Sequence, residues 1–324
     1  MPPHIPSILF VDDEERIVNQ LRMIFRNAYN VHTATSGEEA LQILSSTPID
    51  VLVSDQRMPG MPGMLGVELL EKARQLSPNT MRLLLTGYSD LAAIVGCVNE
   101  GEVFRFINKP WDHEEIQQIM ADACAAGSAA RQASHTEAAL ATRQLIASVK
   151  ENPPKVLLID TNVAELQAMS QVLSSDQSCI LATSISDALD ALSNNDVGVI
   201  VSEARVGRSD MGSFLHLLKQ HHPMITTVLL SRAGDADLVI RMINKAQIFR
   251  FATKPLRKSS FQLAVAAAMK AHFNYRANPA LVNRHRVAED KTASSDASLV
   301  SSVMQSLSSL RQRFSIFGRK REAT

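Results

Sequence analysis

Short apolar runs alternate with amphipathic segments in the N-terminal third of the sequence. The runs are rich in valine, isoleucine and leucine and show little polar alternation, which predicts strands that are buried on both faces. We predict strands over residues 7–11, 29–34, 50–54, 80–85 and 102–107. Because helical periodicity separates these runs, the order of elements predicts a parallel sheet with right-handed crossovers, a doubly wound α/β domain.

Two of the intervening segments carry clear helical signals. Residues 14–27 place Ile17, Leu21 and Ile24 on one face of a helix. Residues 36–46 begin with a serine that is followed three positions later by a glutamate, which is the spacing of a capping box. Both segments therefore predict helices that pack against the sheet.

The same pattern occurs twice in the chain. Three runs of the first half, those that end at Asp12, Asp55 and Lys109, recur in the second half as runs that end at Asp160, Glu203 and Lys254. The offset is 148 positions for the first two runs and 145 for the third. Such self-similarity at a nearly fixed offset predicts two copies of one structural unit.

The repeat divides the chain into four parts. We predict a first domain over residues 1–125, a helical linker over 126–152, a second domain over 153–272 and a tail over 273–324. The linker is rich in alanine and extends the last helix of the first domain until Asn152-Pro153-Pro154 stops it.

The tail is rich in serine, alanine, arginine and asparagine, and it shows no strand pattern. This composition predicts a mostly disordered segment. The alternative is a short amphipathic helix that docks on a partner, because apolar residues recur there at spacings of three and four: Leu299, Val303, Leu307, Leu310 and Phe314.

Charge and cysteine content exclude several classes of protein. The chain has 33 Lys and Arg against 33 Asp and Glu, so it lacks the basic excess that binding to nucleic acid or an anionic membrane needs. Its cysteines, Cys97, Cys124 and Cys179, have no paired spacing, which excludes a disulfide framework and a cysteine zinc site. No apolar run has the length of a membrane span, and residues 1–7 lack the features of a secretion signal. We therefore expect a cytoplasmic protein.

Polar residues follow the predicted strands of the first copy. Asp12 and Asp13 follow the first strand, Asp55 ends the third, Thr86 the fourth and Lys109 the fifth. Ligands of doubly wound sheets bind beyond the carboxyl ends of the strands, so these side chains are expected to converge. A divalent cation and the lysine would offset the repulsion between three carboxylates, and Mg²⁺ suits oxygen ligands of this kind. One carboxylate could then attack a phosphoryl donor. For any single aspartate, a helix N-cap is an equally good interpretation.

These motifs resemble a known family. Asp12-Asp13, Asp55 with Met58-Pro59-Gly60, Thr86-Gly87 and Lys109-Pro110 resemble the receiver domain of bacterial two-component response regulators over about residues 5 to 125. The resemblance implies a flavodoxin-like, CheY-like fold. The run from Phe104 to Trp111 is similar to receivers of HD-GYP-type regulators, although no such domain follows in this sequence.

The resemblance also implies roles for individual residues. Asp55 would accept a phosphoryl group from a histidine kinase or a histidine phosphotransfer protein, and Thr86 and Lys109 would bind the phosphoryl oxygens. The metal ligands for Mg²⁺ would be Asp12, Asp13, Asp55 and the backbone carbonyl of Arg57. Phe106 stands at the family's aromatic switch position, and an ordinary core aromatic is the open alternative.

The second copy resembles the same fold but departs from the pattern at its site. Asp160 and Lys254 are retained, whereas Thr161 replaces the second acid, Glu203 the phosphoacceptor and Ser231 the threonine. We expect weak Mg²⁺ binding and no phosphorylation in this pseudo-receiver. Two interpretations stay open: Glu203 pairs with Lys254 and holds the copy in a fixed state, or the glutamate is simply tolerated where no chemistry takes place.

The predicted function is that of a response regulator with tandem receivers joined by a long helix, without an enzymatic or DNA-binding output domain. Phosphorylation would change contacts with a downstream protein or between two copies of the chain, at a face formed by a helix over residues 90–99 and the fifth strand. The alternatives are a phosphatase with an aspartate nucleophile and a phosphate sink within a phosphorelay. A dehydrogenase is excluded, because the glycines at positions 60, 63 and 66 have the wrong spacing and follow the third strand.

Overall fold

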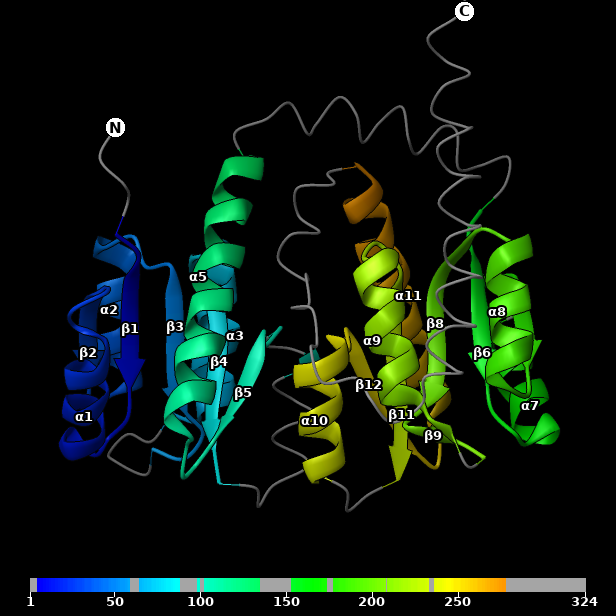
Figure 1. The fold of residues 1–324 in the computed structure, drawn as a ribbon, viewed down its shortest axis with the longest axis horizontal. Coiled ribbons are helices and arrows are strands. Elements are labelled where there is room, and N and C mark those ends of the chain that lie inside the picture. Colours follow the sequence, from blue (N-terminus) through cyan, green and yellow to red (C-terminus); the bar gives the residue numbers. More distant parts are fainter. Residues whose placement is uncertain are drawn as a thin grey trace, which may run out of the picture. The chain divides into compact units, whose positions relative to one another are not determined.

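The computed structural model describes residues 5–58, 64–87, 98–99, 102–134, 153–173, 177–207, 209–232 and 236–277. The chain forms two compact units, the first built mainly from Met1–Thr136 and the second mainly from Glu137–Arg232 and Lys245–Val282. Each unit contains a five-stranded parallel sheet (Figure 1). Within these ranges, no helix is long and apolar enough to cross a membrane.

The first sheet has the strand order β2-β1-β3-β4-β5. Its strands are β1 (Ser7–Val11), β2 (Asn30–Ala34), β3 (Val51–Asp55), β4 (Met81–Thr86) and β5 (Arg105–Asn108). The helices of this part are α1 (Glu15–Phe25), α2 (Gly37–Ser46), α3 (Gly66–Leu76) and α5 (His113–Ser134). The predicted α/β class and the parallel sheet are therefore confirmed for this region.

The central strands are buried on both faces, as their unbroken apolar runs predicted. Ile8 and Phe10 of β1 belong to a core cluster that also contains side chains of α1 and α5. Leu9, which points to the opposite face, is also fully buried. Helices on both faces of the sheet leave its carboxyl edge as the place where polar side chains gather.

The α2 N-terminus shows how a local signal fixes an element boundary. Ser36 is the N-cap, and its hydroxyl accepts a hydrogen bond from the backbone N–H of Glu39 at 3.2 Å. The Glu39 carboxylate accepts from the backbone N–H of Thr35 at 2.8 Å, one residue before the N-cap. The predicted capping box thus forms in a shifted version, and it still satisfies two backbone donors.

The last strand of the first sheet starts later than predicted. The sequence predicted a strand from residue 102, but β5 begins at Arg105. Glu102 has a φ of 49°, and this left-handed conformation interrupts an extended strand. Gln247 has a φ of 51° at the corresponding position of the second copy. The two copies therefore share a conformation that apolar periodicity does not report.

The second half of the chain forms a sheet with the order β7-β6-β8-β11-β12, which is the same topology. Its strands are β6 (Lys155–Ile159), β7 (Cys179–Ala182), β8 (Val197–Glu203), β11 (Thr226–Arg232) and β12 (Arg250–Lys254). The short strands β9 (Arg205–Val206) and β10 (Ser209–Asp210) pair antiparallel outside this sheet. The helices are α7 (Val163–Leu173), α8 (Ile185–Asn194), α9 (Met211–His221), α10 (Ala236–Ala246) and α11 (Lys258–Ala277).

Several predictions fall on segments outside the described residues. These are the linker after Ser134, the tail after Ala277, Pro59-Gly60 and most of the expected helix over residues 90–99. The described part of the linker, up to Ser134, continues α5. The predicted domain boundaries and the character of the tail stay predictions.

Candidate functional site

Five of the predicted site residues lie at the carboxyl edge of the first sheet. Asp12 and Asp13 follow β1, Asp55 is the last residue of β3, Thr86 is the last residue of β4, and Lys109 follows β5. Strands β1, β3, β4 and β5 are neighbours in the sheet. Parallel pairing therefore brings together side chains that are far apart in the sequence.

Lys109 connects two of the carboxylates. Its Nζ lies 2.7 Å from Asp12 Oδ2 and 2.6 Å from Asp55 Oδ1. The Asp12 side chain is 1% exposed and the Asp55 side chain 11%, so both ion pairs are shielded from solvent. Buried carboxylates of this kind require a charged partner or hydrogen bonds, and the lysine supplies both.

The remaining carboxylate oxygens are fixed by the backbone. Asp55 Oδ2 accepts a hydrogen bond from the N–H of Arg57 at 3.0 Å. Asp12 Oδ1 accepts from the N–H of Glu14 at 3.0 Å, while Asp12 Oδ2 pairs with Lys109. The N-cap of α1 is Glu14, without a side-chain capping hydrogen bond, so the N-cap interpretation of Asp12 is wrong and the residue belongs to the site.

Burial and charge act in opposite directions at Asp55. Burial raises the pKa of its carboxyl, the hydrogen bond and charge of Lys109 lower it, and the charge of Asp12 raises it; the result is a raised pKa. For Lys109, burial alone would lower the pKa, but the hydrogen bonds to Asp12 and Asp55 outweigh it and the pKa is raised. The lysine therefore stays cationic beside the acids.

The acidic cluster fits a divalent cation. Asp12, Asp13 and Asp55 each offer one carboxylate oxygen, and these oxygens lie within 4.8 Å of one another. Hard oxygen donors, with Asp13 only partly buried, match the ligand preference of Mg²⁺ and leave room for water or phosphate oxygens. The sequence selected these three residues, and the structure brings them together.

Thr86 and Phe106 are both buried, at 4% and 0% exposure. The backbone carbonyl of Thr86 accepts a hydrogen bond from the N–H of Lys109 at 2.9 Å, which links the ends of β4 and β5. The proposed phosphoryl contacts of Thr86 and Lys109, the switch role of Phe106 and the metal-binding role of the Arg57 carbonyl stay predictions.

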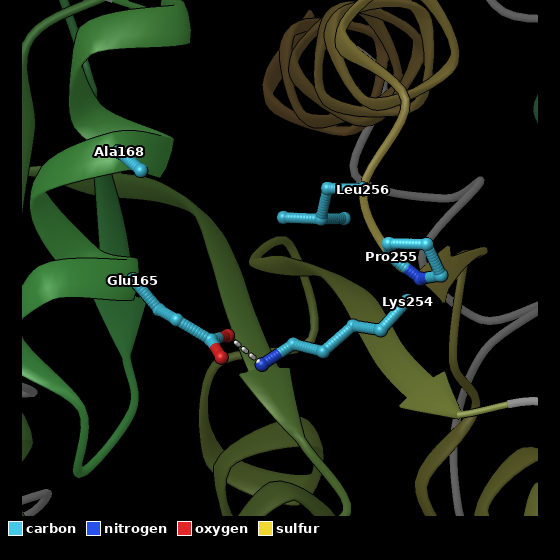
Figure 2. Close-up of a pocket in the computed structure, with 5 residues that line it drawn as sticks. All are labelled: Glu165, Ala168, Lys254, Pro255 and Leu256. Atoms are coloured by element: carbon cyan, nitrogen blue, oxygen red, sulfur yellow. Dashed lines mark hydrogen bonds and ion pairs between the residues drawn. The ribbon is translucent and has the colours of Figure 1, made fainter.

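The corresponding edge of the second sheet is arranged around Lys254. Lys254 Nζ forms ion pairs with Asp160 at 3.0 Å, with Glu203 and with Glu165. Figure 2 shows Glu165, from α7, reaching across to the lysine at the end of β12. Thr161 is exposed, and Ser231 lies in β11 next to β12. We call Lys254 and its three acids the lysine–carboxylate cluster.

Sequence reasoning did not find Glu165. At the offset of 148 positions, Glu165 corresponds to Ile17 of the first copy, an apolar position on the predicted helix face. An acid at a position that is apolar in the other copy was the available signal. It could have been found by aligning the two copies along the whole helix instead of at the site positions alone.

Comparison with known proteins assigns the first sheet to a family. Residues 8–121 match the family described as Response regulator receiver domain. The N-terminal region is a response regulator receiver domain. Receiver domains generally bind Mg²⁺, which the cluster of Asp12, Asp13 and Asp55 fits.

Curated relatives match a third to a half of this chain. Hydrogenase transcriptional regulatory protein HoxA of Cupriavidus necator is 38% identical over 109 residues, which cover 33% of this chain and 22% of that protein. Regulatory protein AtoC of Escherichia coli is 30% identical over 168 residues, which cover 52% of this chain and 35% of that protein. The matches thus span between about a fifth and a third of these relatives.

Solved receiver structures are also similar. The signal receiver domain of an HD domain-containing protein from Pseudomonas fluorescens Pf-5 is 34% identical to this chain, with a TM-score of 0.39. The match covers 41% of this chain and 96% of that structure.

Proposed function

We propose that the chain is a two-component response regulator in which Asp55 of the receiver domain accepts a phosphoryl group from a histidine kinase or a histidine phosphotransfer protein. The observation that carries this proposal is the pair of short contacts from Lys109 to Asp12 and Asp55 at the carboxyl edge, with Asp13 close by. The lysine supplies positive charge at the carboxylate that would react.

In the proposed step, a carboxylate oxygen of Asp55 attacks the phosphorus of a phosphohistidine. The new O–P bond forms as the N–P bond breaks, and the electron pair of the broken bond stays on the imidazole nitrogen. Lys109 holds the Asp55 carboxylate and offsets charge on the transferred oxygens. Asp12, Asp13 and Asp55 would hold Mg²⁺, which when bound offsets charge on the phosphoryl oxygens.

The test is labelling with radioactive acetyl phosphate in the presence of Mg²⁺. We expect the wild-type chain to take up label and Asp55→Asn to take up none. Glu203→Gln is the matched control in the second copy and should be labelled like the wild type. Persistent labelling of Asp55→Asn at another residue of the receiver domain would overturn the assignment of Asp55.

The second copy is proposed to be a pseudo-receiver that does not accept a phosphoryl group. The observation that supports this is the position of Glu203, whose carboxylate is already paired with Lys254. An Asp55→Ala chain should therefore remain unlabelled. Label that mass spectrometry locates on residues 155–272 would contradict the proposal.

A phosphatase with an aspartate nucleophile was the main enzymatic alternative, because Glu14 offers an acid two positions after Asp12. The Glu14 carboxylate pairs with Arg16 at 3.2 Å, and its side chain is 57% exposed. This orientation argues against a second catalytic acid at residue 14. Steady release of phosphate from a general phosphomonoester would reverse that conclusion.

We propose that the output is protein–protein contact, with a homodimer or a downstream protein as the partner, and that the chain is not a dedicated enzyme. A phosphate sink within a phosphorelay would instead show rapid return of the phosphoryl group to the donor and no change of partner. Pull-down with and without beryllofluoride distinguishes the two. A response that is absent from Asp55→Asn supports the switch, whereas the same partners in both states contradict it.

DNA binding is a second candidate output, because the relative HoxA is a transcriptional regulatory protein. The neutral charge balance of this chain does not favour it. A gel-shift assay decides the question: sequence-selective binding by the purified chain would replace protein contact as the proposed output. The resemblance to receivers of HD-GYP-type regulators likewise stays a prediction.

A further inference from the structure

The second site keeps the number of acids in the first site but arranges them differently. In the first copy the metal-ligand candidates are Asp12, Asp13 and Asp55, and Lys109 pairs with two of them. In the second copy the acid after Asp160 is lost to Thr161, and an acid is gained at Glu165. The gained acid lies on a helix, so it approaches the lysine from a different direction (Figure 2).

The geometry of Lys254 matches the capacity of its side chain. An ammonium group has three N–H donors and no acceptor. Lys254 Nζ is paired with one oxygen each of Asp160, Glu165 and Glu203, so each donor has one carboxylate. The Lys254 side chain is 8% exposed and that of Asp160 is 7%, so these two charges are shielded from bulk solvent, whereas Glu203 at 29% and Glu165 at 38% are partly exposed.

The cluster joins four elements of the second sheet and its surroundings. Asp160 follows β6, Glu165 lies in the first turn of α7, Glu203 ends β8 and Lys254 ends β12. The three acids offer oxygens within 4.8 Å of one another, as the acids of the first site do. Without a cation between them, these carboxylates would repel one another.

The residues around Lys254 also differ from those at the matching positions of the receiver domain. In the receiver domain, Ile17 and Trp111 pack against the core cluster of the first sheet. At the matching positions of the second copy stand Glu165 and Leu256, and a pocket lies there, lined by Glu165, Ala168, Lys254, Pro255 and Leu256 (Figure 2). Leu256 still packs against the core of the second sheet, so the change lies on the helix, where the ion pair of Glu165 with Lys254 replaces the apolar contact of Ile17.

We propose that Lys254 is the built-in counter-ion of the second unit: its ammonium group takes the place of a divalent cation and holds the acidic edge together without metal or phosphorylation. Glu165 is a positioning residue that ties α7 to Lys254. Hydrogen bonds to the three acids outweigh the effect of burial and raise the pKa of Lys254, so the charge persists at any ordinary pH.

This inference does not depend on phosphorylation of Asp55. It concerns the second unit alone, so it can fail while the proposed function stands, and the reverse also holds. The test uses the full chain with Asp13→Asn and Asp55→Asn, which remove two acids of the first site and so suppress metal effects that originate there. The readout is hydrogen exchange of second-unit peptides, measured by mass spectrometry with and without Mg²⁺.

With Lys254 in place, exchange over residues 155–173 and 250–262 should be the same with and without Mg²⁺. In Lys254→Met, exchange of these peptides should be faster by at least about tenfold without Mg²⁺, and saturating Mg²⁺ should restore protection because it replaces the missing charge. Lys258→Met changes an exposed lysine four positions further on and is the matched control. Its hydrogen exchange should equal that of the chain that carries only Asp13→Asn and Asp55→Asn.

Two results would overturn the proposal. One is slower hydrogen exchange of the second unit in Mg²⁺ while Lys254 is in place, which would make a metal and not the lysine its counter-ion. The other is Lys254→Met exchange that equals that of Lys258→Met.

Should Lys254→Met remain unfolded even with Mg²⁺, Glu165→Ile decides the matter. This variant installs the residue of the first copy and leaves the lysine with two acids. We expect faster exchange in the first turn of α7 and at residues 254–257, without any response to Mg²⁺. Unchanged hydrogen exchange in the first turn of α7 and at residues 254–257 would refute the positioning role of Glu165.

Discussion

Lys109 and Lys254 stand at corresponding strand ends of two sheets with the same topology, yet they are held in different ways. Lys109 pairs with two aspartates at the edge, and its side chain is 25% exposed. Lys254 pairs with three acids, and its side chain is 8% exposed. The lysine of the receiver domain is accessible to an incoming oxyanion, whereas the lysine of the second unit is enclosed by its own acids.

The comparison shows that the chemistry at the carboxyl edge of a sheet depends on which elements supply the acids, as well as on which residues are present. Both edges have three acids and one lysine, and both have a cis peptide bond between the lysine and the proline that follows it. The acids of the receiver domain all stand at or just after strand ends. In the second unit one of the three acids comes instead from helix α7.

The largest expected effect comes from transferring the acceptor of the second unit to the first. Asp55→Glu lengthens the side chain by one methylene and moves the carboxylate into the space for the phosphoryl group. We expect phosphorylation by acetyl phosphate to fall by at least about 100-fold, because misplacement of a reacting group by about 1 Å has effects of that size.

The reverse change, Glu203→Asp, should not create an acceptor, because Glu165 still pairs with Lys254 and Thr161 is no acid. Both variants are assayed by labelling of the full chain. Labelling of Asp55→Glu at the wild-type rate would show that side-chain length does not separate the two sites.

A second prediction concerns the backbone behind Asp55. A Cβ added to Gly66 would lie 2.2 Å from the backbone oxygen of Asp55 and 2.9 Å from Leu84 Cδ1. Gly66→Ala should therefore lower the free energy of unfolding of the receiver domain by about 3 kcal/mol, the upper range for overpacking a core.

Gly87→Ala is the control, because nothing lies within 4 Å of the added Cβ there. Urea unfolding followed by the fluorescence of Trp111, the single tryptophan, compares the two variants. Equal midpoints for both would mean that the backbone at Asp55 can move away at little cost.

A third prediction uses a buried lysine of the second unit. Lys219 of α9 is 4% exposed and donates to the carbonyls of Pro223 at 2.9 Å and Ile225 at 3.2 Å, whereas the matching residue of α3 is Arg74, which pairs with Glu102 and has a 38% exposed side chain. Burial lowers the pKa of Lys219 to about 7 from 10.5. Between these values the unfolded chain binds more protons than the folded one, so the unit becomes more stable as pH rises from about 7.

The expected slope for Lys219 is about 1.4 kcal/mol per pH unit. Burial lowers the pKa of the neighbouring His272 to about 4, so that group titrates below this window. Lys219→Met should remove the slope and Lys258→Met should keep it, as measured by denaturant-dependent hydrogen exchange of second-unit peptides. A slope that survives in Lys219→Met would assign the effect to another group.

The smallest effect is expected for stability at the phosphoacceptor. Because burial raises the pKa of Asp55 above its ordinary 3.8, the folded receiver domain loses stability as pH rises through the raised value. Asp55→Asn should therefore be more stable than the wild type at neutral pH, by roughly 1 kcal/mol. The gain should disappear as pH falls below the ordinary value.

Thermal unfolding of the receiver domain between pH 3 and pH 7 measures the effect of Asp55→Asn, with Glu203→Gln as the control in the second unit. A wild-type domain more stable than the variant at neutral pH would mean that the ion pair with Lys109 outweighs the cost of burying the carboxylate.

Much of the fold followed from local patterns. Apolar runs located the five strands of the first sheet, and the boundary at Arg105 was missed because the left-handed conformation of Glu102 leaves no trace in hydrophobicity. The repeat offset carried the same topology to the second half of the chain. Helix α2 followed from Ser36 and Glu39, although the glutamate bonds one residue earlier than a capping box predicts.

The residues of the two sites also divide into those that the sequence identified and those that only the tertiary structure revealed. The sequence alone determined which acids, threonine and lysine stand at strand ends, because parallel strands in one sheet place their carboxyl ends together whatever lies between them. Only the tertiary structure decided that Glu165 reaches Lys254, that Lys219 is buried and that Gly66 lies against Asp55. These contacts join side chains or backbone of different elements, and their distances depend on how helices and loops pack, which no periodicity along the chain records.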